Sequence, residues 1–334
     1  MKKQDSPVWV IAEQIDCQVL AVSFQLIGQA RKLAAELGTC VEVVLLGDNI
    51  SEQARQLIAA GADKVYLGNA PDLAFYQPEI YTEIIVKLAK ERRPEIMLIG
   101  STSAGTELAP LVAAGLETGL TAHCIDLVLD ENKLLISKIP AYGGMMSIIC
   151  PEKCPQMATI AAGVFTSPHP DESRTGEIVP LKVPDELPGR IQTLKVVREE
   201  PEGVPLESAP IVVAGGAGAG DRKGWGLIAD LAQALNAALG STRPAVDEGW
   251  TELETMIGQS GKMVSPELYI GVGLSGELQH MVGVVGAKVM VAINNDAKSQ
   301  VFEQVDYGIV DDCREFVPVL IEKIKEYREK LVTC

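Results

Sequence analysis

Short apolar runs alternate with helical patterns along the first third of the chain. Mainly apolar runs occupy positions 8–12, 41–46, 64–67 and 96–99, which is typical of strands buried in a sheet. Between these runs, apolar residues repeat at helical spacing over residues 30–37, 51–60, 78–91 and 107–115. Strands separated by helices of this kind predict a mainly parallel sheet with helices on both faces.

The pattern changes after residue 125. Shorter apolar runs over residues 125–164, broken by Gly143, Gly144 and Pro151, indicate β-rich structure that closes a first domain. Residues 167–210 are rich in proline and acidic side chains, which is typical of an exposed connection. We therefore expect an N-terminal α/β domain over residues 1–207, including this connection from about residue 167, and a C-terminal domain over residues 208–334.

A second alternating array fills the C-terminal domain. The pattern predicts strands over residues 211–214, 269–272, 289–293 and 308–310, and helices over 225–239, 277–282 and 314–331. The last helix carries apolar residues at helical spacing, which favours packing on its own sheet over docking of a partner. The predicted fold class is α/β, with two domains that are each a mainly parallel sheet flanked by helices.

Charge and composition exclude several classes of function. Lys and Arg number 29 against 45 Asp and Glu, and this net charge of -16 repels nucleic acid and anionic lipid. No apolar run reaches the roughly 18 residues that a membrane span needs, and no signal-type apolar core follows Lys2 and Lys3. We expect a cytoplasmic protein that binds no nucleic acid and does not insert stably into membranes.

The cysteines do not indicate a disulfide framework or a metal centre. They number seven and are scattered, so reduced thiols fit best. Cys150 and Cys154 form one local pair, but no second pair at zinc-site spacing accompanies it, and the nearest histidine in sequence is His169. We therefore predict no metal site.

Turns of ligand-binding type gather in the C-terminal domain. The glycine-rich segment 215–220 lies between a predicted strand and a predicted helix, where a loop can bind a nucleotide phosphate. It lacks the Lys-Ser/Thr ending of a P-loop and only partly matches the Rossmann glycine spacing, so a tight turn without a ligand stays open. Polar turns at 242–243, 258–261, 273–280 and 293–296 would converge with it on one edge of the sheet.

Two residues of these turns have both a structural and a functional interpretation. His280 is either a helix histidine satisfied by a carbonyl or a donor to a cofactor oxygen. Arg243 lies shortly before Asp247 and Glu248, so it either forms a local ion pair or faces a ligand. The residues alone leave both alternatives open.

Several motifs of this domain point to one family. They are Arg243-Pro-Ala-Val-Asp-Glu-Gly-Trp250, Ile257-Gly-Gln-Ser-Gly-Lys262, Pro266-Glu-Leu-Tyr-Ile270, Gly273-Leu-Ser-Gly276 with Gln279-His280, Ala292-Ile-Asn294 and Asp306-Tyr-Gly-Ile-Val310. With them the chain resembles the large (alpha) subunit of electron transfer flavoproteins. The N-terminal domain agrees less closely, at positions 8–10, 61–65, 155–159 and 163–165.

The resemblance implies a Rossmann-like C-terminal domain that holds one FAD. It also implies a heterodimer with the smaller electron transfer flavoprotein beta subunit, and electron exchange with acyl-CoA dehydrogenase-type flavoenzymes of fatty acid beta-oxidation. The chain would be an electron carrier subunit and not a stand-alone enzyme. A flavin-bifurcating complex, in which the beta subunit holds a second FAD that reacts with NADH, is an open alternative within the family.

Residue roles follow from the same motifs. The resemblance places Arg243 over the isoalloxazine ring, Ser260 near N5 and His280 on the C2 carbonyl side. A guanidinium keeps its proton at every working pH, so Arg243 would stabilise negative charge on the N1–C2=O edge of reduced flavin. The other cofactor-binding residues that the resemblance implies are Thr242, Ile257, Gly258, Gln259, Ser275, Gly276, Glu277, Leu278, Gln279, Asn294, Asp312 and Cys313.

Three positions depart from the family pattern. Ala217 stands where an Arg is common in the glycine loop, so Arg222 or Lys223 would have to supply that charge. Asn295 replaces the usual Lys, and Cys154 replaces an Arg.

Two other classes of function remain. One is a nucleotide-binding α/β module without redox activity, since parallel sheets host many functions. The other is a nicotinamide dehydrogenase acting alone, for which the chain's three histidines offer no convincing acid/base pair.

Overall fold

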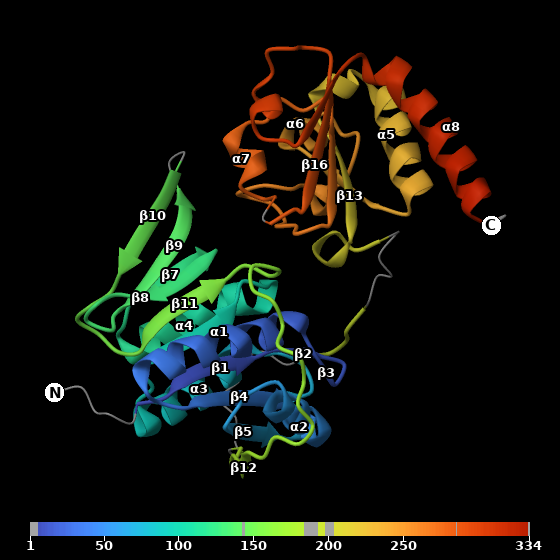
Figure 1. The fold of residues 1–334 in the computed structure, drawn as a ribbon. Helices are drawn as coiled ribbons and strands as arrows, with labels where there is room; N and C mark the ends of the chain where they lie inside the picture. Colours follow the sequence, from blue (N-terminus) through green and yellow to red (C-terminus); the bar gives the residue numbers. More distant parts are fainter. Residues whose placement is uncertain (1–5, 142–143, 184–192, 198–203, 285, 333–334) are drawn as a thin grey trace. The chain divides into compact units, whose positions relative to one another are not determined.

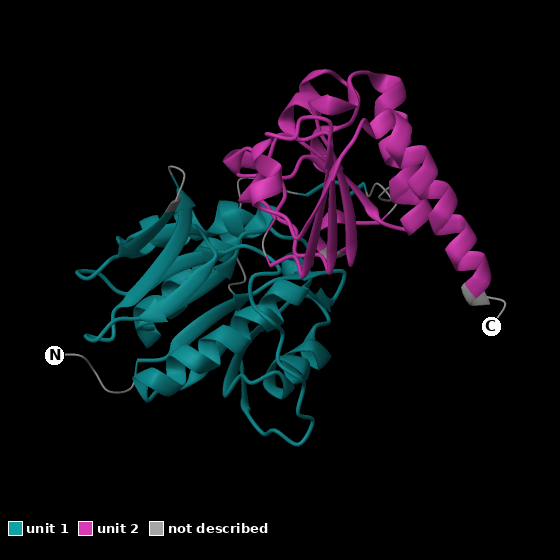
Figure 2. Ribbon diagram, turned by 45° about the horizontal axis from the view of Figure 1, so that its top comes forward, with its two compact units in different colours: residues 1–197 teal, residues 198–334 magenta. Residues whose placement is uncertain are grey.

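The computed structural model describes residues 6–141, 144–183, 193–197, 204–284 and 286–332. The chain divides into two compact units, residues 1–197 and 198–334 (Figure 2). Parts of the connection predicted from the sequence, at residues 184–192 and 198–203, lie outside the described residues. The domain boundary near residue 207 stays a prediction.

A parallel sheet of seven strands forms the centre of unit 1 (Figure 1). Its strands are β1 (Val8–Ala12), β4 (Val41–Gly47), β5 (Lys64–Asn69), β6 (Ile96–Gly100), β7 (Leu120–Cys124), β11 (Gln156–Ile160) and β12 (Glu177–Pro180). The order is β12-β5-β4-β1-β6-β11-β7, and all neighbours are parallel. Strands β1, β4, β6 and β11 are buried along their whole length, which explains why the sequences of β1 and β6 are apolar throughout.

Helices cover both faces of this sheet, as the sequence predicts. They are α1 (Ala21–Leu37), α2 (Ser51–Ala59), α3 (Pro78–Arg92) and α4 (Ser103–Leu116), with the short 3-10 helix η1 (Pro71–Leu73) before α3. Val8 and Val10 of β1 pack in one core layer with α1 and α2, whereas Trp9 and Ile11 pack with α3 and α4. Helix α1 begins well before residue 30, because buried residues such as Leu26 and Ile27 extend its apolar face.

Antiparallel strands close unit 1, which confirms the β-rich character of residues 125–164. Strands β8 (Asp126–Leu129), β9 (Leu135–Ala141) and β10 (Gly144–Ile149) form a sheet in the order β10-β9-β8, and β2 (Gln14–Ile15) pairs with β3 (Gln18–Val19). Strand β12 lies in the segment expected to be an exposed connection. It pairs in parallel with β5 at the edge of the large sheet, so the connection is more ordered there than its proline content indicates.

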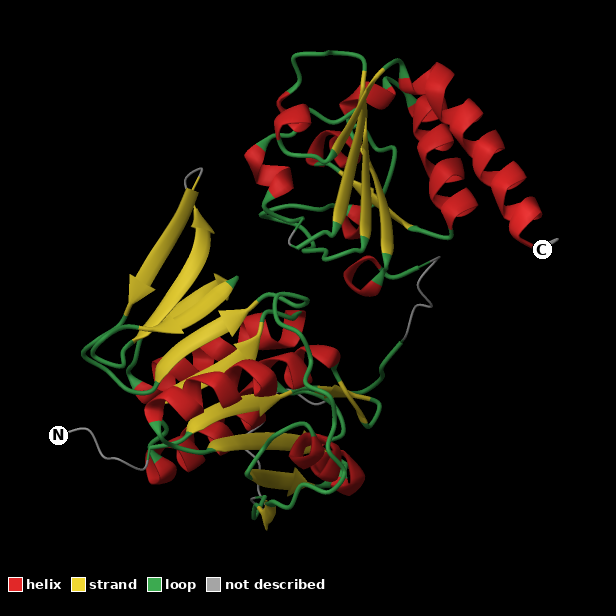
Figure 3. Cartoon of the chain, viewed as in Figure 1, coloured by secondary structure: helices red, strands yellow, loops and turns green. Residues whose placement is uncertain are grey.

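Unit 2 is built on a five-stranded parallel sheet (Figure 3). Its strands are β13 (Ile211–Gly215), β14 (Ala238–Ser241), β15 (Leu268–Val272), β16 (Val289–Asn294) and β17 (Tyr307–Val310). The order β14-β13-β15-β16-β17 is the doubly wound order 2-1-3-4-5. It shares the doubly wound arrangement with the Rossmann order 3-2-1-4-5-6 but differs from it in the order itself. The order reverses between β13 and β15, and ligands bind beyond the carboxyl ends of such strands.

The helices of unit 2 are unequal in length. They are α5 (Arg222–Leu235), α6 (Arg243–Asp247), α7 (Leu278–Met281) and α8 (Cys313–Val332), with 3-10 helices η2 (Leu206–Ser208), η3 (Ala217–Ala219), η4 (Leu253–Thr255) and η5 (Gln300–Glu303). Long helices α5 and α8 lie side by side on one face of the sheet, where Val317 is fully buried. On the other face, Tyr269 of β15 packs with Ile257 and Met281. Among the described residues, no helix has the length and apolar character needed to cross a membrane.

The predicted helix over residues 225–239 is wrong in its last part. Helix α5 begins earlier, because Asp221 Oδ1 accepts hydrogen bonds from the backbone N–H groups of Lys223 and Gly224, both at 2.9 Å. It ends at Leu235, because the following Asn236 has a left-handed φ of 53°, a conformation that asparagine tolerates. The apolar residues that follow form β14, which the sequence pattern did not predict because it assigned residues up to 239 to the helix.

Candidate functional site

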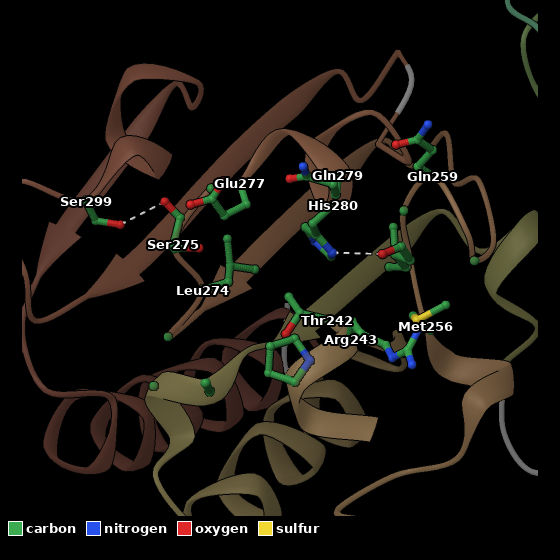
Figure 4. A pocket seen from close by; sticks show the side chains of 18 of the residues that line it. Thr242, Arg243, Met256, Gln259, Leu274, Ser275, Glu277, Gln279, His280 and Ser299 are labelled. Carbon is green, nitrogen blue, oxygen red and sulfur yellow. Dashed lines mark hydrogen bonds between the residues drawn. The ribbon is translucent and has the colours of Figure 1, made fainter. Parts of the chain in front are cut away.

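A cavity of about 640 Å³ lies beyond the carboxyl ends of β13 and β15 (Figure 4). Its volume is typical of small-molecule sites. Its position is the point where the strand order of unit 2 reverses, as expected for a ligand site of a doubly wound sheet. Residues from the loop after β13, the start of α6, segment 256–261, segment 273–280 and the turn after β16 line it.

The cavity brings together most of the site residues predicted from the sequence. In its lining are Thr242, Arg243, Ile257, Gly258, Gln259, Ser260, Ser275, Gly276, Glu277, Gln279, His280 and Asn294. Lining residues that the prediction missed are Ala217, Gly218, Pro244, Met256, Gly261, Gly273, Leu274, Asp296 and Ser299. Most of these belong to turns that the sequence singles out, whereas Met256 and Ser299 carry no local signal.

Three predicted residues are not among those that line the cavity in the described chain: Leu278, Asp312 and Cys313. Asp312 Oδ1 accepts a hydrogen bond from the backbone N–H of Arg314 at 2.9 Å, at the start of α8. Cys313 is buried behind the glycine loop, where its Sγ donates to the carbonyl of Gly218 at 3.6 Å, and burial raises the pKa of its thiol. Their contact with a cofactor stays a prediction.

The glycine loop packs against the loop after β15. Gly218 N–H donates to the carbonyl of Gly273 at 2.7 Å, and Gly216 N–H donates to that of Val272 at 3.0 Å. A Cβ on Gly218 would lie 2.6 Å from the oxygen of Gly273, so only glycine permits this approach. The glycines therefore serve a tight packing of two strand-end loops, and this packing builds one side of the cavity.

Arg243 begins helix α6 directly after Thr242. Its Nε donates to Asp247 Oδ1 at 2.8 Å, and its side chain is 66% exposed, so the local ion pair is confirmed. The residue also lines the cavity, where it is the one arginine or lysine among the described lining residues. The acids of the same lining are Glu277 and Asp296. Arg243 is therefore the fixed positive charge available to a ligand there.

His280 is 6% exposed, and both of its ring nitrogens have partners. Nδ1 lies 2.9 Å from the carbonyl oxygen of Ile257, and Nε2 lies 2.6 Å from the hydroxyl of Tyr269. A carbonyl only accepts, so Nδ1 carries the hydrogen and Nε2 accepts from the tyrosine. Burial lowers the pKa of His280 to about 4, and the bond to Ile257 opposes this shift. The ring is neutral at physiological pH, and the carbonyl of Ile257 satisfies its Nδ1, as in the structural interpretation; its contact with a cofactor stays a prediction.

Asn294 joins the loops that follow β15 and β16. Its Nδ2 donates to the carbonyl of Leu274 at 2.8 Å and to Ser299 Oγ at 3.2 Å, while its Oδ1 accepts from the backbone N–H of Asp296 at 2.9 Å. Ser299 Oγ donates in turn to the carbonyl of Ser275 at 3.1 Å (Figure 4). These bonds hold the cavity-lining loop 274–276 in place.

Comparison with known proteins places both units in one family. Residues 8–186 match the electron transfer flavoprotein domain, and residues 205–285 match the electron transfer flavoprotein FAD-binding domain. The chain belongs to the electron transfer flavoprotein alpha subunit family. FAD is its cofactor, and electron transfer is its role.

Three relatives illustrate the family. The electron transfer flavoprotein subunit alpha of Thermoanaerobacterium thermosaccharolyticum is 41% identical over 324 residues, covering 96% of this chain and 98% of the relative. That of Megasphaera elsdenii is 38% identical and covers 96% and 97%. Subunit LctC of lactate dehydrogenase (NAD(+),ferredoxin) from Acetobacterium woodii is 35% identical and covers 95% of this chain and 77% of the relative.

The cavity of this flavoprotein subunit fits a dinucleotide cofactor. Thr242 Oγ1 is buried without a hydrogen-bond partner in the described part of the chain, and Thr242 belongs to the cavity lining. A buried polar atom of this kind is normally satisfied, and a bound ligand would supply its partner. Gly276 has a φ of +81°, and a Cβ there would lie 2.4 Å from the backbone of Val301, so only glycine lets this lining loop pack so closely on η5.

Arg222 and Lys223 are the basic residues that follow Ala217 in the sequence, and neither lies at the cavity in the described chain. Arg222 Nη2 donates to the carbonyl of Gly249 at 2.5 Å. Arg314 of α8 is not a lining residue either, but it reaches the glycine loop, where its Nη2 donates to the carbonyl oxygen of Ala219 at 3.1 Å. It also pairs with Asp221 at 3.0 Å, which neutralises part of its charge.

Proposed function

We propose that this chain is the FAD-carrying alpha subunit of a heterodimeric electron transfer flavoprotein, an electron carrier and not a stand-alone enzyme. The observation that carries the proposal is the convergence of the motif residues on one cavity at the point where the sheet order reverses. The smaller electron transfer flavoprotein beta subunit is the proposed partner, and acyl-CoA dehydrogenase-type flavoenzymes are the proposed electron donors or acceptors.

Roles for individual residues are part of this proposal. FAD, when bound, supplies one-electron and two-electron redox chemistry. Arg243 offers its permanent charge to the flavin ring, and its ion pair with exposed Asp247 is weak enough to give way. Ser260 offers a hydroxyl near N5, and His280 a neutral ring near the C2 carbonyl. The residues proposed to contact the rest of the cofactor are Thr242, Ile257, Gly258, Gln259, Ser275, Gly276, Glu277, Leu278, Gln279, Asn294, Asp312 and Cys313.

A bifurcating type of complex is the second form of the same proposal. The relative LctC belongs, by its name, to a lactate dehydrogenase that uses NAD(+) and ferredoxin. This likeness supports a complex in which the beta subunit holds a second FAD that reacts with NADH, and the FAD of this chain passes an electron onward.

The alternative of a nucleotide-binding module without redox activity finds less support in unit 1. The strand order of the large sheet in unit 1 reverses between β1 and β6, and a ligand would be expected beyond their carboxyl ends, near the start of α4. The carboxyl group of Glu13 occupies it: Thr102 Oγ1 donates to Glu13 Oε2, and a Cβ on Gly105 would lie 3.1 Å from Oε1. A phosphate would compete with this acidic side chain for the start of α4.

An anaerobic titration of the chain co-purified with its beta subunit tests the proposal. NADH is added before dithionite, and flavin per heterodimer is counted in the same sample. Two flavins that bleach with NADH alone support the bifurcating type, whereas one flavin that is inert to NADH supports a carrier fed by dehydrogenases. A colourless complex that FAD cannot reconstitute would contradict both.

A further inference from the structure

We propose that Tyr269 is a positioning residue that keeps His280 neutral, so that the fixed positive charge of the flavin cavity stays confined to Arg243. The proposal rests on the proposed function of the cavity, and it concerns a residue outside the cavity lining. It adds to that function the expectation that the charge of His280 in the cavity lining stays constant near neutral pH.

Both ring nitrogens of His280 have a hydrogen-bond partner. Tyr269 lies on β15 with 0% exposure, and its hydroxyl is 2.6 Å from Nε2 of His280. The opposite nitrogen donates to the carbonyl of Ile257 at 2.9 Å. Because the tyrosine hydroxyl is the donor to Nε2, the lone pair that a proton would need is already in use.

Protonation of His280 would force a second change. Nε2 would become a donor, and the tyrosine hydroxyl would have to turn its own hydrogen to another acceptor. Tyr269 is fully buried, so its hydroxyl has no contact with bulk water that could accept this hydrogen bond. A charged imidazolium would also be buried in this apolar layer, which holds Ile257 and Met281.

The charged groups around His280 do not strongly favour its protonated form. Glu277 lies on the same lining segment 273–280 as His280, Asp296 follows β16, and both acids line the cavity. Arg243 on α6 is paired with Asp247 at 2.8 Å. On the segment that holds Ile257, Lys262 pairs with Glu207 at 3.0 Å. Burial favours the neutral ring and has the largest effect on the pKa of His280.

The test compares wild type with Tyr269→Phe, which removes one hydroxyl and keeps the ring. Tyr307→Phe is the matched control, because Tyr307 is 65% exposed on β17. Each full-length chain is prepared with FAD and the beta subunit and labelled with ¹³C and ¹⁵N in histidine. The chain has only three histidines, so the loss of one signal in His280→Gln assigns the ring.

We expect the wild-type ring to show the Nδ1-protonated tautomer with no titration between about pH 5.5 and 9. In Tyr269→Phe the midpoint should rise by roughly one pH unit, because one hydrogen bond to the neutral form is lost. Tyr307→Phe should match wild type. The one-electron potential of the couple between oxidised flavin and the anionic semiquinone, which takes up no proton, should change little between about pH 8 and pH 5 in wild type and should rise at pH 5 in Tyr269→Phe.

Two results would overturn the role of Tyr269. One is a wild-type His280 that titrates near its ordinary value or carries its hydrogen on Nε2, and this result needs no variant to fold. The other is an identical midpoint in wild type and Tyr269→Phe. A preparation that takes up no FAD contradicts the proposed function instead, and the histidine spectra still decide the role of Tyr269.

Discussion

The guanidinium Nε of Arg243 lies 2.8 Å from a carboxylate oxygen of Asp247, one turn further along α6. Both side chains are more than half exposed, and an exposed pair of this kind contributes about 0–1 kcal/mol. The pair orients Arg243 at the cavity without binding it tightly. A cofactor can therefore take over the guanidinium at little cost.

Replacing Arg243 with alanine should lower the one-electron reduction potential of the flavin. A charged hydrogen bond is worth about 1.5–3 kcal/mol, which corresponds to roughly 65–130 mV for one electron. Spectroelectrochemical titration measures this shift. Asp247→Asn keeps the guanidinium and removes only its exposed partner, so it should not lower the potential. An unchanged potential in Arg243→Ala would remove Arg243 from this role.

Gly276 and Gly249 allow the effect of a positive φ to be separated from the effect of a close backbone contact. Both have positive φ, +81° and +66°, but a Cβ on Gly276 would meet the backbone of Val301 at 2.4 Å, whereas one on Gly249 meets nothing within 4 Å. We expect Gly249→Ala to cost about 1 kcal/mol of unfolding free energy. Gly276→Ala should cost about 3 kcal/mol or more and weaken FAD binding. Denaturant unfolding measures both, and equal losses would show that the close contact is unimportant.

Glu13 makes the stability of unit 1 depend on pH. Burial raises the pKa of its carboxyl to about 7 from an ordinary 4.5. The folded state therefore holds a proton that the unfolded state has lost, and stability falls as pH rises from about 5 to about 7. Glu13→Gln should remove this loss and be more stable than wild type at pH 8, by about 3 kcal/mol.

Hydrogen exchange of the β1 and β6 amides at pH 5 and pH 8 measures the effect of Glu13 locally. Glu131→Gln, at an exposed position, serves as the control and should change nothing. Equal pH dependence in Glu13→Gln and wild type would refute a protonated Glu13.

Helix α8 offers a matched pair of valines. Val317 is fully buried against α5 and the sheet, whereas Val319 is 54% exposed. Val317→Asp buries an unpaired carboxylate, so it should lower the free energy of unfolding by several kcal/mol. Unit 2 should then unfold and lose its FAD. Val319→Asp should lie within about 0.5 kcal/mol of wild type. Thermal unfolding and flavin content report both; a yellow, stable Val317→Asp protein would show that α8 is dispensable.

Strands that are apolar on both faces, such as β1, could be predicted from the sequence almost to the residue. Strand β1 is apolar throughout because Val8 and Val10 face one layer of helices while Trp9 and Ile11 face the other. Strand β14 could not be predicted, because good helix formers continue past Asn236 and only its left-handed backbone ends the helix. Strand β12 is an exposed edge strand that ends in Pro180, so no hydrophobic period marks it.

The site could be predicted where its residues lie in contiguous turns at strand ends. The turns that hold Gln259, Ser275 and Asn294 meet at one cavity because parallel strands bring their carboxyl ends together. Contacts between distant elements carry no such signal. The bond of Tyr269 to His280 and the reach of Arg314 to the glycine loop depend on how helices and loops pack, and only the structure shows them.

Flavin content per heterodimer in a cavity-filling variant tests the central claim most directly. Ser275 is exposed in the cavity lining, so Ser275→Trp should fill the space that FAD would occupy. Asp230→Trp, at an exposed position of α5 outside the lining, is the control. We predict that Ser275→Trp holds one FAD fewer than wild type after saturation with FAD, while the control holds as many. Equal flavin content in all three proteins would contradict the assignment of FAD to this cavity.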